Sequence, residues 1–72
     1  MKSYWEIIRE LREDRDLKQY EIAAILGTTQ QVYSRYENGL NEMPIRHLAT
    51  LCSYYRVSAD YVLGLSKCKE II

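Results

Sequence analysis

The 72-residue sequence has few of the residues and patterns that build secreted, metal-binding or membrane proteins. It contains no phenylalanine, one proline, three glycines and one histidine, and its two cysteines are Cys52 and Cys68. Two cysteines with a single histidine support neither a disulfide scaffold nor a zinc site. No apolar run approaches the roughly 20 residues that cross a bilayer, and the first residues lack the apolar core of a signal peptide. We therefore expect a soluble, cytoplasmic protein with no membrane contact and no metal.

An excess of charge of either sign is also missing. Ten Lys and Arg residues balance ten Asp and Glu residues, so the formal net charge is zero. Nucleic-acid-binding domains are usually strongly basic, and this composition alone does not predict such a partner. Hydrophobic residues make up 47% of the chain, too large a share for intrinsic disorder. A chain this short buries only about 60% of its unfolded surface, which leaves room for a single domain.

The arrangements that catalysis needs are absent as well. The sequence has no Ser, His and Asp in a hydrolase order, no glycine-rich phosphate loop and no pair of carboxylates suited to a pocket. We expect a protein that is not an enzyme, that uses no cofactor and that has no small-molecule effector.

Apolar residues recur at three- and four-residue spacing along nearly the whole chain, and no segment alternates as a β-strand does. The pattern predicts an all-α, compact five-helix bundle. We expect helices over residues 4–14, 19–26 and 30–38, a fourth helix opened by Pro44, and a last short helix capped by Ser58. The glycines expected to close helices are Gly27, Gly39 and Gly64.

Side-chain caps are also expected at the second and third helices. Asp16 is expected to cap the second helix, with Gln19 three residues later as its capping-box partner. A hydroxyl of Thr28 or Thr29 is expected to cap the third helix, with Gln31 completing a box from Thr28.

The fourth helix is expected to bury one apolar stripe. Its members are Ile45, Leu48, Ala49, Cys52 and Tyr55. His47 then falls on the exposed side, where it has no Cys, Asp or second His at ligand spacing. Cys68 is expected to be an exposed thiol in the tail.

The most informative stretch is residues 19–38, where two short helices are separated only by the triplet Gly-Thr-Thr. A turn this tight makes the two helices cross at a large angle and leaves the second one exposed. Ala23 fits this arrangement because a larger side chain would push the helices apart. We predict a helix-turn-helix at 19–38 within a domain spanning residues 1–66, followed by a tail at 67–72.

Particular residues of this stretch match a known pattern. They are Gln19, Ala23, Gly27, Gln30, Ser34, Arg35, Tyr36 and the run Glu37-Asn38-Gly39. The sequence resembles the helix-turn-helix domain of the Cro and phage-repressor type, also called the XRE family. The flanking residues 17–19 and 57–64 match too, so the resemblance covers about residues 4–64. It implies a lambda-repressor-like bundle whose third helix enters the major groove of double-stranded DNA.

The resemblance assigns base reading to the start and outer side of the third helix. Glutamine pairs bidentately with adenine and arginine with guanine, which makes Gln30, Gln31 and Arg35 candidate base-reading residues. Ser34 joins them as a short hydroxyl residue suited to a base or phosphate. The alternatives are that the glutamines are merely solvated and that Arg35 pairs with a carboxylate.

Four further residues are candidates for the DNA backbone. Gln19 is expected to donate to a phosphate and to buttress Gln30, and Thr29 offers a hydroxyl. The Tyr33 ring is interpreted as core and its hydroxyl as a phosphate donor at the surface. Asn38 is assigned to a phosphate, with helix termination as the equal alternative.

The resemblance also implies a structural ion pair between Arg12 and Glu37, tying the first helix to the end of the third. Removing one partner of such a pair strands the other, at a cost of about 3–5 kcal/mol.

The neutral charge limits how this DNA binding would work. Relatives commonly place Lys or Arg in the loop after the third helix, where this chain has Glu42. Non-specific affinity should be poor, so we expect a homodimer, at least on DNA. The candidate dimer surface consists of Tyr54, Val57, Tyr61 and Leu65, with Ile71 in the tail. Alternatively, Tyr61 and Leu65 pack under the fourth helix.

The function predicted from sequence is a sequence-specific, double-stranded DNA-binding transcriptional regulator. We expect a repressor on a pseudo-palindromic operator, because no region is left to contact a polymerase. The alternative is a protein-interaction module of the same fold, antitoxin-like or regulator-sequestering, with weak DNA affinity.

Overall fold

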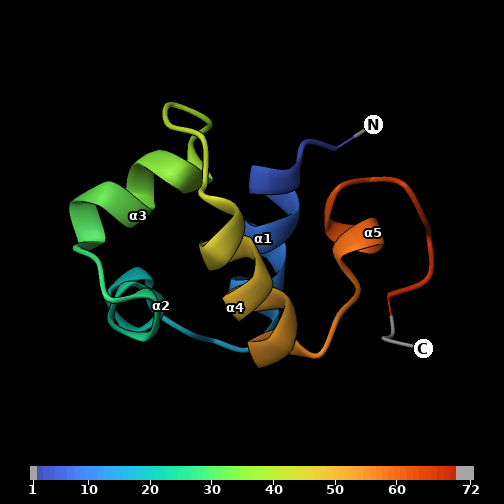
Figure 1. Cartoon of the computed structure of the whole chain (residues 1–72). Helices are drawn as coiled ribbons and strands as arrows, with labels where there is room; N and C mark the ends of the chain where they lie inside the picture. Colours follow the sequence, from blue (N-terminus) through green and yellow to red (C-terminus); the bar gives the residue numbers. More distant parts are fainter. Residues whose placement is uncertain (1, 70–72) are drawn as a thin grey trace.

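Five helices in sequence order carry the chain in a computed structural model that describes residues 2–69 (Figure 1). They are α1 (Tyr4–Asp14), α2 (Gln19–Leu26), α3 (Gln30–Glu37), α4 (Ile45–Tyr55) and α5 (Ala59–Val62). The predicted all-α five-helix bundle is confirmed. Figure 1 shows α3 and α5 on opposite sides of the molecule, with α1 and α4 between them.

The core forms where the apolar stripes of the helices meet. Ile8 of α1, Ile22 of α2, Leu51 of α4 and Val62 of α5 each keep at most 1% of their surface exposed. Burying one such side chain stabilises the fold by about 1.5–3 kcal/mol. None of the helices within residues 2–69 is long and apolar enough to cross a membrane.

The turn between α2 and α3 has the geometry that the Gly-Thr-Thr triplet predicts. Gly27 takes a left-handed φ of 70°, which a residue without Cβ adopts at little cost. Thr29 then caps α3, its Oγ1 accepting the Val32 N–H at 3.2 Å. The box from Thr28 is not formed, because Thr29 is the N-cap. Ala23 of α2 is buried, as its predicted place at a close helix contact requires.

The cap expected at α2 is wrong. Asp16 takes a left-handed φ of 55° in the turn after α1, and Lys18 is the N-cap residue. The Lys18 backbone N–H donates to Oε1 of Glu21 at 2.8 Å. The carboxylate at the start of α2 is therefore that of Glu21, inside the first turn, and not that of Asp16.

The predicted buried face of α4 is confirmed at Cys52 and Tyr55, which are buried, and at Leu48, which is partly buried, but it is wrong at the other positions. Ile45 is 83% exposed and Ala49 is exposed, whereas His47 is buried together with Leu51 and Cys52. Positions 47, 48, 51, 52 and 55 form an equally regular helical stripe. The apolar pattern of the sequence did not indicate it, because position 47 is a polar histidine. The His47 ring lies 6.0 Å from the Tyr36 ring, and burial lowers the pKa of His47.

The described part of the tail folds back onto the start of α5. The Ser58 backbone N–H donates to the Lys69 carbonyl at 3.0 Å, and the Ser58 hydroxyl donates to the Cys68 carbonyl at 3.1 Å. The same hydroxyl oxygen accepts the Tyr61 N–H at 3.1 Å, so the expected Ser58 cap is confirmed. Cys68 is exposed. Ile71 lies outside the described residues.

Candidate nucleic-acid interface

The outer side of α3 carries the polar residues predicted to read bases. Gln30, Gln31 and Arg35 are exposed and Ser34 is partly exposed. They line an open hollow of about 640 Å³ together with Gln19, Asn38 and Leu40. The structure therefore brings all four predicted base-reading residues together on one surface, beside two of the predicted backbone-contacting residues.

The inner side of α3 faces the core. Tyr33 is fully buried, and its ring lies 6.4 Å from that of Tyr36 in an edge-to-face arrangement. The interpretation of the ring as core is confirmed, but the phosphate contact assigned to the hydroxyl is wrong. That hydroxyl is buried close to the Glu37 carboxylate, but the Tyr33 hydroxyl and the carboxylate do not meet the geometry of a hydrogen bond. Burial first, and then the carboxylate, raise the pKa of Tyr33.

Glu37 joins three helices through its buried carboxylate. Arg12 of α1 donates to both oxygens, from Nε at 2.7 Å and from Nη2 at 3.0 Å. Gln19 of α2 donates from Nε2 to Oε1 at 3.1 Å. The Arg12–Glu37 pair is thus present, and a third Arg12 nitrogen, Nη1, donates to the Leu17 carbonyl at 2.8 Å.

The charge state of Glu37 follows from these donors. Burial alone would raise the pKa of Glu37, but the hydrogen bonds from Arg12 and Gln19 and the nearby Tyr33 hydroxyl outweigh it, so the pKa lies below its usual value. The hydrogen bond to Glu37 raises the pKa of Arg12. Both groups stay charged at neutral pH, and α3 is held to the body by an ion pair.

Arg9 was missed by the sequence analysis. Its Nη2 donates to the Glu37 backbone carbonyl at 3.0 Å and to Oδ1 of Asn38 at 2.9 Å. The one signal in the sequence is its position three residues before Arg12, on the same side of α1. At Asn38, the side-chain Nδ2 lies 3.4 Å from Oγ of Ser34.

The residues predicted for a dimer surface lie from the end of α4 to the segment after α5, and they differ in accessibility. Leu65 is 75% exposed, Tyr54 is 41% exposed and Tyr61 is partly buried. Val57 is only 4% exposed, so its assignment to a dimer surface is wrong: its side chain belongs to the core.

The turn at Gly27, the exposed α3 and the buried Arg12–Glu37 pair define a helix-turn-helix domain. The chain belongs to the helix-turn-helix family of the Cro and XRE type, whose model matches residues 8–62, from α1 to the end of α5. This confirms the resemblance drawn from the sequence.

Two relatives extend the comparison. The chain is 35% identical over 60 residues to "Antitoxin PezA" of Streptococcus pneumoniae, a match covering 83% of this chain and 38% of that protein. It is 33% identical over 63 residues to "Uncharacterized HTH-type transcriptional regulator YobD" of Bacillus subtilis, covering 88% of this chain and 56% of that protein. The chain thus matches only about half, or less, of each relative's length.

Two solved structures share the fold. The P22 c2 repressor protein, crystallised with a synthetic operator, superposes with a TM-score of 0.81 at 23% identity, covering 92% of this chain and 100% of that one. A transcriptional regulator from Listeria innocua gives a TM-score of 0.83 at 24% identity, covering 97% of this chain and 64% of that one. The predicted lambda-repressor-like fold is confirmed.

Proposed function

We propose that this protein is a sequence-specific DNA-binding transcriptional regulator that inserts α3 into the major groove of double-stranded DNA. The supporting observation is the two-sided character of α3. Its outer side presents Gln30, Gln31 and Arg35 around one open hollow, while its inner side is fixed to the body by Glu37. Amides at the leading end of α3 and a guanidinium in its last turn suit the edges of adenine and guanine.

Neutral donors supply most of the backbone contacts in this proposal. Gln19 keeps a second Nε2 hydrogen after donating to Glu37, and Thr29 keeps its hydroxyl hydrogen after capping α3. Asn38 lies at the edge of the same hollow. Amides and hydroxyls hold phosphates without releasing counterions, so the salt dependence of binding should be shallow.

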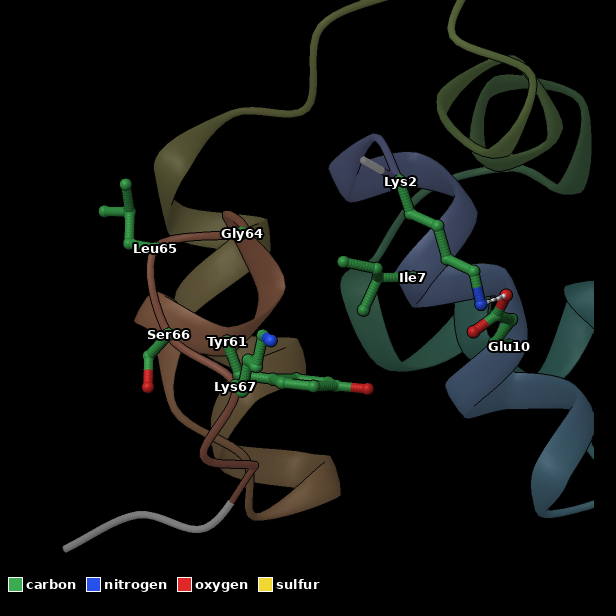
Figure 2. Close-up of a pocket in the computed structure, with 8 residues that line it drawn as sticks. All are labelled: Lys2, Ile7, Glu10, Tyr61, Gly64, Leu65, Ser66 and Lys67. Atoms are coloured by element: carbon green, nitrogen blue, oxygen red, sulfur yellow. Dashed lines mark ion pairs between the residues drawn. The ribbon is translucent and has the colours of Figure 1, made fainter.

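The chain acts as a homodimer on a pseudo-palindromic operator and represses by occluding the promoter. Two copies one helical turn apart double the contacts that a neutral monomer makes, with half-sites spaced by about 34 Å. Tyr54, Tyr61 and Leu65 remain as the dimer surface. Tyr61 and Leu65 line a groove of about 680 Å³, in which Ile7 of α1 and the ion pair between Lys2, which precedes α1, and Glu10 of α1 face the Tyr61 ring (Figure 2).

A protein-interaction module of the same fold is the second candidate. The zero net charge and the exposed Glu42 in the loop between α3 and α4 favour it. One relative also carries the name antitoxin. Against this candidate stands the exposed set of amides on α3, which a module released from base reading has no reason to keep.

Selection from a random duplex library separates the two candidates. DNA binding predicts an enriched half-site with adenine near its outer end, contacted by Gln30 or Gln31. Ser53→Ala, at an exposed site on α4, is the matched control and should enrich the same sequence. If neither the wild type nor Ser53→Ala enriches any sequence, the result would favour the interaction module.

A further inference from the structure

Arg9 reaches the C-terminal end of α3 from α1. A single nitrogen, Nη2, donates to two oxygens there, the Glu37 carbonyl and Oδ1 of Asn38. Nε of Arg9 lies 3.8 Å from Oε1 of Glu37. The hollow around α3 is lined by Asn38 but not by Arg9. Arg9 therefore meets the proposed DNA surface through Asn38.

The chemistry of a guanidinium decides which way the Asn38 amide points. Arginine only donates hydrogen bonds, so the Asn38 atom facing it is the carbonyl oxygen. The amide nitrogen then points toward Ser34, whose Oγ is 3.4 Å away. Turning the amide over would set the Nδ2 hydrogens against those of Arg9. Arg9 thus selects one of the two amide orientations.

This orientation makes the C-terminal part of the surface a set of donors. Nδ2 carries two hydrogens, and one remains when the other is directed at Ser34. Oγ of Ser34 accepts from Asn38, so the Ser34 O–H stays available as a donor. Ser34 and Asn38 line the same hollow as Arg35. The guanidinium of Arg35 adds further donors and no acceptor. Acceptors are the complement of such a surface.

We infer that Arg9 is a positioning residue for DNA binding, which holds the Asn38 amide so that Nδ2 donates to a hydrogen-bond acceptor on the duplex. The acceptor is a phosphate oxygen or an acceptor atom on a base edge. This inference rests on the proposed function, and it adds a residue of α1 that touches no DNA. Arg9 acts through the geometry of its guanidinium, so another positively charged side chain at this position does not take over its role.

The orientation is tested first in the free protein, by nuclear magnetic resonance of the Asn38 side-chain amide. In the wild type this amide should be rigid, with an order parameter of about 0.8. Arg9→Met should lower that order parameter to below about 0.6. Arg46→Met, at an exposed arginine of α4, is the matched control and should leave it unchanged. An amide equally mobile in the wild type and in Arg9→Met overturns the inference.

The role in binding is tested by a double-mutant cycle on the selected duplex. Asn38→Ala and Arg9→Met should each weaken binding by about threefold to tenfold, as expected for one lost hydrogen bond. The double variant should bind no more weakly than either single variant. Arg9→Lys, which keeps the charge, should behave like Arg9→Met. Effects that multiply, or full affinity in Arg9→Lys, would show that Arg9 acts as a phosphate-attracting charge and would overturn the inference.

Modified duplexes identify the acceptor. If it is a phosphate, one methylphosphonate position should weaken the wild type but not Asn38→Ala; if it is a base, one base-pair change should do so. A duplex series that weakens both proteins equally at every position would overturn the inference. A wild-type chain that enriches no duplex would overturn the proposed function instead, and the amide measurement would still decide whether Arg9 holds Asn38.

Discussion

Replacing Arg12 by methionine tests how the helix-turn-helix is held to α1. The change removes two hydrogen bonds, of 2.7 and 3.0 Å, from a carboxylate that is fully buried, and leaves Gln19 as its remaining close donor. Breaking a buried pair on one side costs about 3–5 kcal/mol. A chain of 72 residues has a total stability of roughly 4–11 kcal/mol, so the loss would be a large part of it.

The pH dependence of the free energy of unfolding tests the same prediction in a second, independent way. In the wild type the pKa of Glu37 is depressed in the folded state, so its contribution to stability is present above the ordinary value of 4.5 and is lost as pH falls through the folded pKa. In Arg12→Met, the hydrogen bond that lowers the pKa of Glu37 most is lost, so we expect burial to raise the folded pKa. Its protonated form is then the stable one, so the deficit relative to the wild type should shrink as pH falls from 7 toward 4.5.

Urea unfolding followed by circular dichroism at pH 7 and pH 5 measures both effects. Arg12→Lys keeps the charge but loses the two-pronged contact, so it should remain folded and lose about 1–2 kcal/mol. Arg46→Met is the surface control and should stay within about 0.5 kcal/mol of the wild type. A loss below that level in Arg12→Met, or a deficit that grows on acidification, would refute the reasoning.

Three further predictions concern the surface of α3, the turn after it and the dimer. Gln31→Ala and Arg35→Ala should each cost about 1–3 kcal/mol in DNA binding and relax the preference at one base pair, as measured by titration of single-base variants; equal weakening on all sequences would contradict base reading. Gly39→Ala should lower the melting temperature more than Gly27→Ala, because both glycines have positive φ but only a Cβ on Gly39 would lie 2.6 Å from Cε2 of Trp5; equal shifts would contradict the packing seen here. Leu65→Glu should yield monomers in sedimentation of the DNA complex while leaving stability unchanged, since Leu65 is 75% exposed, and an unchanged assembly would remove this surface from the dimer.

The sequence predicted the helices well because each carries a local stop or start signal. The bounds of α1 and α2 match the predicted ranges, and α3 ends one residue earlier than expected, at Glu37. Gly27 fixes the turn through its own backbone conformation, which needs no knowledge of the rest of the chain. Family resemblance supplied the Arg12–Glu37 pair, which joins residues 25 positions apart.

The errors arise where distant packing decides the outcome. His47 is a polar residue, and its burial beside the Tyr36 ring does not follow from its residue type. The direction of the Tyr33 hydroxyl depends on Glu37 and on the neighbouring helices, because a tyrosine at an inward position can aim its hydroxyl at solvent or at the core. Arg9 acts on residues 28 and 29 positions away, a distance that periodicity does not bridge.

A titration of the labelled protein with its selected duplex tests most directly whether α3 is the reading element. If it is, the largest chemical-shift changes will fall on the side chains of Gln30, Gln31, Ser34 and Arg35. Changes confined to the groove of Tyr61 and Leu65, with the α3 side chains unmoved, would contradict the assignment.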